Sequence, residues 1–237
     1  MQVVIPAHNE ANYVGALLES LREEPEAQII VVDNASSDET GSVARAGGAR
    51  VIRQETRGKG NAVVAGLMVC LPGPVFVCDA DVSGIDPGTI GTLHRLARDR
   101  RAPVARLSLG RPPERSPVSA LTAGPLLAAL GLPVLREPLG GLVMVDRDFV
   151  LDRHLPGGWG FDMALTVAAL AARGEVPELP VTGVRHRRRE LGDFYVEMAE
   201  EVVVALLRAR GLIDWAHEDC ALCGRLESGA TRERIAS

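Results

Sequence analysis

The stretch VVDNASSDETGSVARAGG, residues 31–48, contains the pattern that decides the fold. It begins as an apolar, β-branched run, passes through a polar turn at 33–38, and continues as a helix-like segment closed by two glycines. A strand that leads into a helix through a polar turn is typical of α/β proteins. The turn contains Asp33 and Asp38 as well as short amide and hydroxyl side chains, which is more polarity than one helix cap requires.

The same strand-turn-helix unit recurs on both sides of this stretch. The apolar runs predict four strands, at 2–7, 27–33, 49–54 and 74–81, and the helical periodicity predicts three helices, at 13–24, 39–48 and 58–71. This alternation predicts an α/β fold with a mostly parallel sheet that helices cover on both faces.

The second half of the chain is less regular. We expect helices within 113–131, 157–174 and 193–211, a Gly-rich turn followed by a strand within 137–150, and a strand over 178–186. The segment after about residue 215 has weak periodicity, and we interpret it as a tail.

Composition narrows the class of protein. The net charge of −5 argues against a general nucleic-acid binder. The apolar runs are too short to span a membrane, and the first residues lack the cationic start of a signal peptide, so we expect a cytoplasmic protein. Four cysteines make no disulfide framework in a chain of 237 residues, and the pair Cys220 and Cys223 is at most half of a zinc site.

Polar side chains follow three of the predicted strands, at 8–10, 33–38 and 79–81. The carboxyl ends of parallel strands share one edge of a sheet, where ligands bind. Asp79 and Asp81 are one residue apart and can share a divalent cation, because Mg²⁺ and Mn²⁺ prefer oxygen ligands and the phosphates of a substrate. The triplet at 79–81 could also occur in a solvated loop. However, this triplet directly follows an apolar strand, and that position favours a metal site.

Two cationic features stand out. His186 lies amid four arginines, at positions 185 and 187–189, which should favour its neutral, metal-ligating form. The arginines suit a phosphate or carboxylate, although a solvated basic turn would contain them too. Lys59 is the only lysine among 26 basic residues, which reflects either chance in an arginine-biased chain or the need for a compact ammonium.

Several motifs carry a resemblance. The first half resembles nucleotide-sugar-dependent glycosyltransferases of the GT-A fold, family 2-like, through VVIPAHNE, VVDNASSDET, GKGNA and CDAD. The second half is similar more specifically to the glucosyl-3-phosphoglycerate synthases, through AGPLLAALG, EPLGG, GWGFD and GVRHRRR. The resemblance covers roughly residues 2–210.

The resemblance implies a GT-A (Rossmann-like) fold in one domain over 1–214, followed by a tail at 215–237. Residues 1–82 would form the nucleotide-binding half, and 83–214 the acceptor-side half with a C-terminal helix. It implies a UDP-sugar donor, Mg²⁺ or Mn²⁺, a small anionic acceptor, retention of anomeric configuration and a homodimer.

The resemblance also implies the roles of individual residues. Asp81 and His186 would hold the metal, while Asp79 and Asp162 would act near the sugar as catalytic residues. The nucleotide sugar would be bound by Pro6, Ala7, Asn9, Glu10, Asp33, Ser36, Lys59, Asp79 and Gly140. The acceptor would be bound by Arg111, Arg185 and Arg188.

Three departures from the family pattern stand out. Asp162 replaces a glutamate, a carboxylate is lost in the motif at 140–142, and the basic motif at 185–189 is one residue shorter, with Arg188 in the place of an acceptor-binding asparagine. We therefore expect this chain to retain the donor chemistry of the family and to use a different acceptor. That acceptor would be either a phosphoglycerate-like molecule or a natural-product intermediate.

Two other functions remain open. A sugar-phosphate nucleotidyltransferase also combines an α/β sheet with Mg²⁺, but its first loop is usually Gly-rich and basic, whereas PAHNEANYVG is acidic and amide-rich. A nucleotide-sugar-binding pseudoenzyme would be expected to lose metal ligands, yet Asp79, Asp81 and His186 are all present.

Overall fold

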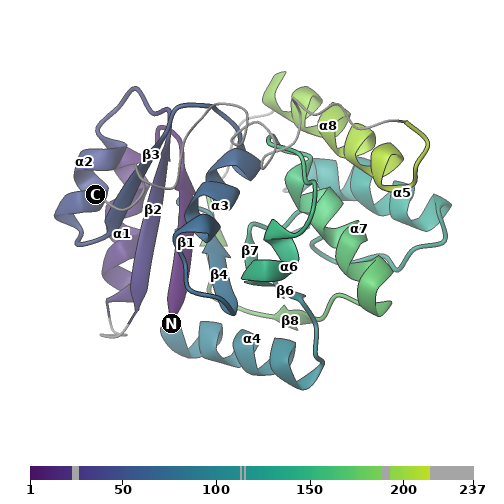
Figure 1. Cartoon of the computed structure of the whole chain (residues 1–237), viewed down its shortest axis with the longest axis horizontal. Helices are drawn as coiled ribbons and strands as arrows, with labels where there is room; N and C mark the ends of the chain where they lie inside the picture. The colour runs from purple at the N-terminus through teal and green to yellow at the C-terminus, as the bar shows by residue number, and fades with distance from the viewer. Residues whose placement is uncertain (23–26, 113, 115, 188–192, 214–237) are drawn as a thin grey trace.

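The centre of the molecule is a seven-stranded sheet with the strand order β3-β2-β1-β4-β7-β6-β8 (Figure 1). The structure, a computed structural model, describes residues 1–22, 27–112, 114, 116–187 and 193–213. The strands of this sheet are β1 (Gln2–Ala7), β2 (Gln28–Asn34), β3 (Arg50–Gln54), β4 (Pro74–Cys78), β6 (Val104–Ser108), β7 (Leu142–Asp146) and β8 (Glu178–Pro180).

The sheet is mostly parallel, which confirms the predicted fold class. β1 pairs in parallel with both β2 and β4, β2 pairs in parallel with β3, and β6 pairs in parallel with β8. β7 pairs antiparallel with β4 on one side and with β6 on the other, so it is the reversed strand of this sheet. The carboxyl ends of β1, β2 and β4 therefore meet at one edge, as the strand-turn-helix repeats predict.

Helices cover both faces of the sheet (Figure 1). They are α1 (Ala11–Leu21), α2 (Thr40–Ala46), α3 (Lys59–Met68), α4 (Pro87–Asp99), α5 (Gly124–Ala129), α6 (Arg147–Leu151), α7 (Phe161–Arg173) and α8 (Asp193–Ala209), with a short π-helix, η2 (Ser119–Ala123), before α5.

The strands separate two apolar cores because successive side chains point to opposite faces. On β1, Val4 belongs to the core that α3, α5, α7 and α8 cover, and Val3 belongs to the core that α1 and α4 cover. Leu17 of α1 and Leu67 of α3 are both fully buried, one in each core. The run of β-branched residues in each strand thus forms two cores at once.

A second, two-stranded sheet stands beside the carboxyl end of β4. β5 (Val82–Ser83) pairs antiparallel with β9 (Arg185–His186), and Val82 lies opposite His186 in the register. This pairing places the distant basic motif next to the D-x-D triplet.

The second half contains elements that the sequence reading did not predict. α4, β6 and α6 were not assigned, and the expected strand over 178–186 is two strands in different sheets, β8 and β9. The reason is that β6 interrupts its apolar run with Arg106, and β9 is too short to have a period of its own.

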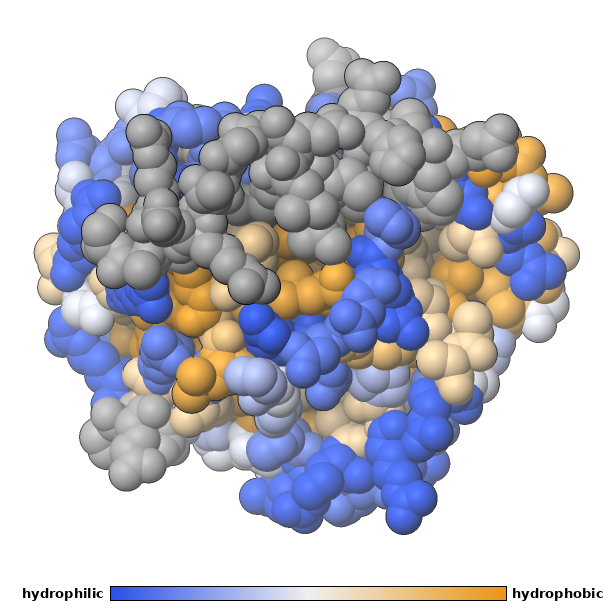
Figure 2. All heavy atoms as spheres, in the orientation of Figure 1, coloured by the Kyte–Doolittle hydropathy of each residue, from blue (hydrophilic) through white to orange (hydrophobic). Residues whose placement is uncertain are grey.

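Among the described residues, none of the helices is both long and apolar enough to cross a membrane. Figure 2 shows hydrophilic side chains gathered over α4 at the lower edge of the molecule. The predicted tail lies outside the described residues, together with Cys220 and Cys223.

Candidate active site

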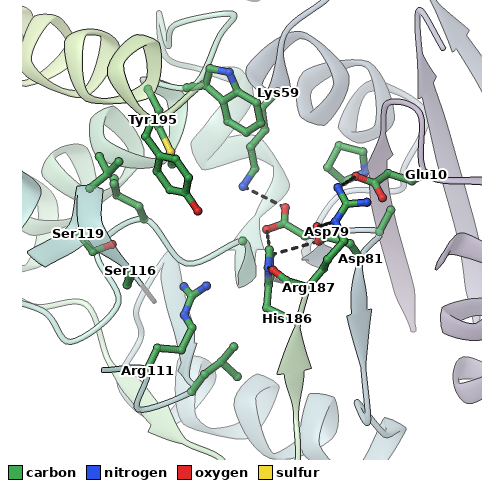
Figure 3. A pocket seen from close by; sticks show the side chains of 18 of the residues that line it. Glu10, Lys59, Asp79, Asp81, Arg111, Ser116, Ser119, His186, Arg187 and Tyr195 are labelled. Carbon is green, nitrogen blue, oxygen red and sulfur yellow. Dashed lines mark hydrogen bonds and ion pairs between the residues drawn. The ribbon is translucent and has the colours of Figure 1, made fainter. Parts of the chain in front are cut away.

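A cavity of about 970 Å³ opens at the edge where the parallel strands end. Figure 3 shows Glu10, Lys59, Asp79, His186 and Arg187 on one side of it, and Arg111, Ser116, Ser119 and Tyr195 on the other. Apart from Lys59, which begins α3, the first group comes from the strand ends, whereas the second comes mainly from the segment after β6 and from α8. The cavity therefore joins the two halves of the chain.

Asp79, Asp81 and His186 form a candidate metal site. Their ligand atoms lie within 4.8 Å of one another, and His186 Nε2 is 3.2 Å from both Asp79 Oδ2 and Asp81 Oδ1. The pairing of β5 with β9 brings His186 here, and the Arg187 amide donates to the Asp81 carbonyl at 3.1 Å. Two carboxylates and an imidazole suit a divalent cation such as Mg²⁺ or Mn²⁺.

The protonation of His186 differs from the sequence expectation. The neighbouring arginines predicted a neutral imidazole, but the side chain faces Asp79 and Asp81. Burial by itself lowers the pKa of His186, while these carboxylates outweigh burial and raise the pKa above its usual value. These carboxylates therefore favour the imidazolium more than water does, and a metal ion that binds His186 competes with this proton.

Lys59 lies buried between two carboxylates. Its ammonium is 3.0 Å from Asp79 Oδ1 and 2.8 Å from Asp162 Oδ2. Burial alone would lower the pKa of Lys59, but Asp162 and Asp79 outweigh it and raise the pKa. Burial likewise would raise the pKa of Asp79, yet Lys59 and His186 hold it well below its usual range. Both groups are therefore charged at neutral pH.

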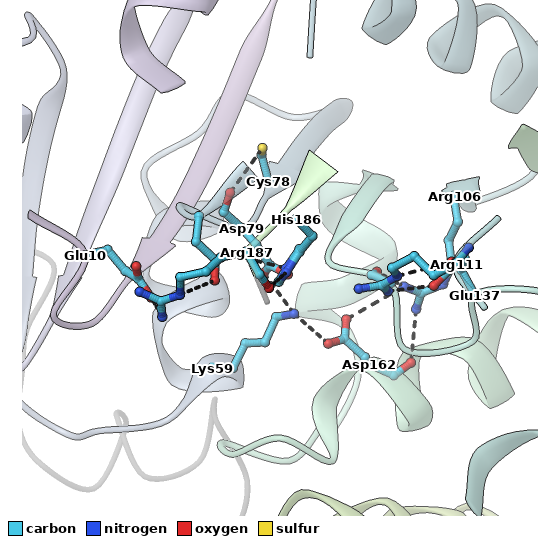
Figure 4. A network of polar contacts seen from close by, with 12 residues as sticks. Glu10, Lys59, Cys78, Asp79, Arg106, Arg111, Glu137, Asp162, His186 and Arg187 are labelled. Carbon is cyan, nitrogen blue, oxygen red and sulfur yellow. Dashed lines mark hydrogen bonds and ion pairs between the residues drawn. The ribbon is translucent and has the colours of Figure 1, made fainter. Parts of the chain in front are cut away.

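Arg187 completes the charged cluster. Its guanidinium lies 3.1 Å from Glu10 Oε1 and 3.5 Å from Asp81 Oδ2, and it stacks 4.5 Å above the ring of Tyr13. Cationic and anionic side chains thus alternate from Lys59 to Glu10 (Figure 4).

The polar residues at the end of β2 mainly bind neighbouring segments of the protein, namely the loop after β1 and the strand β3. Ser36 Oγ accepts from the Asn9 amide at 3.1 Å, and Asp33 accepts from the Ser36 amide and pairs with Arg53 at 2.8 Å. Pro6, Ala7 and Glu10 line the cavity, whereas Asn9, Asp33 and Ser36 are not among its lining residues.

Comparison with known proteins identifies the class of protein. Residues 2–105 match the model of "Glycosyl transferase family 2". The glucosyl-3-phosphoglycerate synthase of Mycolicibacterium smegmatis is 28% identical over 239 residues, covering 90% of this chain and 78% of the relative. The crystal structure of the Mycobacterium tuberculosis enzyme with Mn²⁺, uridine diphosphate and glucosyl-3-phosphoglycerate has a TM-score of 0.81 at 26% identity, covering 90% of this chain and 80% of that one. Mannosyl-3-phosphoglycerate synthase from Rubrobacter xylanophilus has a TM-score of 0.79 at 26% identity, covering 90% and 75%.

The chain is a glycosyltransferase with the GT-A fold.

The basic residues predicted for the acceptor of this glycosyltransferase differ in their surroundings. Arg111 lines the cavity, but it also pairs with the buried Glu137, with Nη2 2.6 Å from Oε2. Arg185 lines the cavity from an exposed position. Arg188 lies outside the described residues.

Two predicted site residues lie behind the cavity wall. Asp162 is 1% exposed and faces the ammonium of Lys59, not the open cavity. Gly140 is buried, and its carbonyl accepts from Arg106 Nη1. The adjacent Gly141 must remain a glycine, because a Cβ there would be 1.8 Å from Asp79 Oδ2.

Sequence reasoning missed several residues of the glycosyltransferase site. Asn34 exchanges hydrogen bonds with the backbone of Gly58 (2.6 and 3.1 Å), which fixes the loop before Lys59. Tyr195 and Trp159 line the cavity. Asn34 could have been found from its place at the end of a predicted strand, and Trp159 from the motif GWGFD, but Tyr195 carries no sequence signal that separates it from core residues.

Proposed function

We propose that this glycosyltransferase moves a sugar from a UDP-sugar to a small anionic acceptor of the phosphoglycerate kind, with a bound Mg²⁺ or Mn²⁺ and with retention of anomeric configuration. The observation that carries the proposal is the trio of Asp79, Asp81 and His186 in one cavity with Arg111 and Arg185. The similar M. tuberculosis enzyme has been crystallised with Mn²⁺, UDP-glucose and phosphoglyceric acid, which supports the same pairing of donor and acceptor.

The site residues divide the work of transfer between the two sides of the cavity. Asp81 and His186 would hold the metal, which supplies positive charge to the departing diphosphate. Asp79 and Asp162 hold Lys59 at the cavity, where its ammonium adds to that positive field. Arg111 and Arg185 would orient the anionic acceptor, so that binding energy is used for positioning.

Retention agrees with the pairing of the carboxylates near the metal. Asp79 is paired with Lys59, and both Asp81 and Glu10 are paired with Arg187. Burial would raise the pKa of Asp79, but Lys59 and His186 hold it well below its usual range, so this carboxylate is a weak proton acceptor. Asp79 therefore suits charge stabilisation better than the general-base role that an inverting reaction requires.

A nucleotide-release assay tests the donor and the metal. We expect release of UDP, and not GDP, from a panel of UDP- and GDP-sugars with 3-phosphoglycerate and related anionic acceptors, only when Mg²⁺ or Mn²⁺ is present. Asp81→Asn should lower this rate at least about 100-fold. Asp99→Asn, which changes an exposed carboxylate at the end of α4, is the matched control and should leave the rate unchanged.

Two outcomes would count against the proposal. Full activity in EDTA would contradict it, and release of pyrophosphate from UTP and a sugar phosphate would favour a nucleotidyltransferase.

The acceptor is tested through the arginines. Arg185→Ala should raise the acceptor KM roughly 10- to 100-fold, because one charged hydrogen bond contributes about 1.5–3 kcal/mol. Hydrolysis of the donor without acceptor should change little. Arg95→Ala, in an arginine of α4 that bonds Thr92, is the control. An unchanged KM in Arg111→Ala, Arg185→Ala and Arg188→Ala would indicate an uncharged acceptor.

Two further expectations, a homodimer and a cytoplasmic location, rest on the family resemblance and on the sequence. Sedimentation equilibrium of the purified protein would test the first, and fractionation of the source cells the second.

A further inference from the structure

Arg106 is a fully buried arginine at the centre of β6, between β7 and the edge strand β8. On β6 it lies on the same face as Val104, in the core that α7 covers. A charged side chain is costly in such a place unless it is both paired and hydrogen-bonded. Its partners therefore indicate what the charge is for.

The partners of Arg106 come from two separate segments around the cavity. Nη1 donates to the carbonyl of Gly140, in the loop before β7. Nη2 donates to the carbonyl of Asp162 at 3.0 Å and to Thr166 Oγ1 at 2.9 Å, both in the first turns of α7. The two Nη atoms of the planar guanidinium serve these acceptors together.

Arg106 also approaches the carboxylate of Asp162. Nη1 lies 3.7 Å from Asp162 Oδ1, while Asp162 Oδ2 lies 2.8 Å from the ammonium of Lys59. The carboxylate is thus held between two cations, one behind it and one at the cavity (Figure 4). Two cations and two carboxylates, Arg106, Lys59, Asp162 and Asp79, balance one another in this buried cluster.

The same guanidinium is connected to Asp79 by a second route. It bonds Gly140, and the next carbonyl, that of Gly141, accepts from the Asp79 amide at 3.1 Å. Because a Cβ at Gly141 would overlap the Asp79 carboxylate, Asp79 packs directly against the backbone of this loop.

We propose that Arg106 is a positioning residue of the transfer reaction, which fixes the carboxylate of Asp162 and, through it, the ammonium of Lys59 at the cavity. Arg106 touches neither the cavity nor the metal ligands, so it acts through Asp162. The effect on turnover rests on the proposed function, but the effect on Lys59 does not.

Two variants separate positioning from simple stability. Arg106→Met removes the guanidinium at similar volume, and Arg106→Lys keeps a charge but carries its donors on one nitrogen, whereas the acceptors are divided between Nη1 and Nη2. We expect Arg106→Met to lower kcat roughly 10- to 100-fold, as small displacements of a reactive site do, and Arg106→Lys to recover part of this loss. Binding of Mn²⁺ alone should stay within about threefold, because Asp81 and His186 are not displaced.

The coupling is tested by a double-mutant cycle. If Arg106 acts through Asp162, then Arg106→Met combined with Asp162→Asn should be no slower than Asp162→Asn alone. Independent, multiplying losses would overturn the proposal. Arg147→Met is the control, because Arg147 also donates to a backbone carbonyl, from its Nε to that of Leu67 at 3.0 Å, and does not line the cavity. An equal loss of kcat in this control would show that Arg106 is only structural.

The single lysine provides a readout without turnover. Protein labelled with ¹³C at the lysine side chain should give one Cε resonance, that of Lys59. Arg106→Met or, if that variant does not fold, Arg106→Gln should move this resonance, whereas Arg147→Met should not. An unmoved resonance in a folded Arg106 variant would overturn the proposal. If the wild-type enzyme transferred no sugar, the proposed function would fail while this measurement would still decide the role of Arg106.

Discussion

At the scale of single residues, Lys59 lies between the carboxylates of Asp79 and Asp162, at 3.0 and 2.8 Å. A compact ammonium fits between two converging oxygens, whereas the wider guanidinium that replaces lysine elsewhere in this chain has a fixed fork of donors. This local geometry explains why an arginine-rich chain has a lysine at this position. It also makes Lys59 a link between β4 and α7.

His186 should make the binding of Mn²⁺ depend on pH. Its pKa is raised by Asp79 and Asp81, so the imidazolium persists above the usual range and competes with the metal. Affinity should rise by about tenfold per pH unit below this pKa and level off above it. Isothermal calorimetry with Mn²⁺ from pH 6 to 8, in buffers of different ionisation enthalpy, would also detect the released proton.

The stability of the metal-free protein should fall as the pH rises, whereas the affinity for Mn²⁺ should increase. A raised folded-state pKa contributes stability that is fully present below the unfolded value of about 6.5 and is lost as the pH rises through the folded value. His186→Gln should remove both pH effects, while His94→Gln, on α4, should leave them intact. Metal affinity that does not change with pH in the wild-type protein would contradict this account.

At the scale of elements, the close contact of α3 with the segment at 156–158 sets the position of Lys59. The Gly60 amide donates to Gly158 and the Asn61 amide to Gly157, at 3.2 and 2.8 Å. A Cβ at Gly60 would be 2.0 Å from the carbonyl oxygen of Pro156, so the helix can approach this closely only because Gly60 has no side chain.

Gly60→Ala should therefore force α3 away from the segment at 156–158. We expect a loss of about 1–3 kcal/mol in the free energy of unfolding, and a larger fractional loss of transfer activity than that change in stability explains. Gly91→Ala is the control, because its Cβ would meet only Arg95, at 3.9 Å, within a helix where alanine is favoured by about 0.5–1 kcal/mol. Urea titration measures the free energy of unfolding of both variants, and the transfer assay measures their activity. A Gly60→Ala protein that is active and fully stable would refute the role of this contact.

At the scale of the whole molecule, one sheet runs through both halves of the chain, since β7 pairs with β4 and with β6. The cavity also takes residues from both halves, including Asp79 and Arg111. We therefore expect one cooperative unfolding transition, and not two.

Ligand binding should stabilise this whole unit. UDP with Mn²⁺ at about 100 times the dissociation constant adds about 2.7 kcal/mol, which for a chain of this size raises Tm by roughly 5–11 °C. Scanning calorimetry with UDP and Mn²⁺, with EDTA added as the control, measures the shift. Asp81→Asn should abolish it, and two separate transitions, of which only one shifts, would show that the halves unfold independently.

The sequence predicted the first half of the fold because that half is built from local patterns. Apolar runs at 2–7, 27–33, 49–54 and 74–81 each indicate a strand without reference to any other part of the chain, and all four are strands of the sheet. The placement of Asp79 and Asp81 at the edge of the sheet follows from the same patterns, because the ends of parallel strands must share an edge.

The second half depends on contacts that sequence patterns do not show. β6 was missed because Arg106 interrupts its apolar run, and that arginine is tolerated only because α7 and the loop before β7 supply its acceptors. The same holds for the reversed direction of β7, which pairing with its two neighbouring strands determines.

The sequence by itself determined which side chains have the chemistry, and the tertiary structure decided their charges and roles. His186 is surrounded by arginines in the sequence but by carboxylates in space, because Asp79 lies 107 positions away and reaches it through the pairing of β5 with β9. Asp33 and Ser36 stand at a strand end, as predicted, yet they hold the neighbouring loop. The physical reason is that a pKa and a hydrogen bond depend on distances of a few ångströms, which only the folded chain sets.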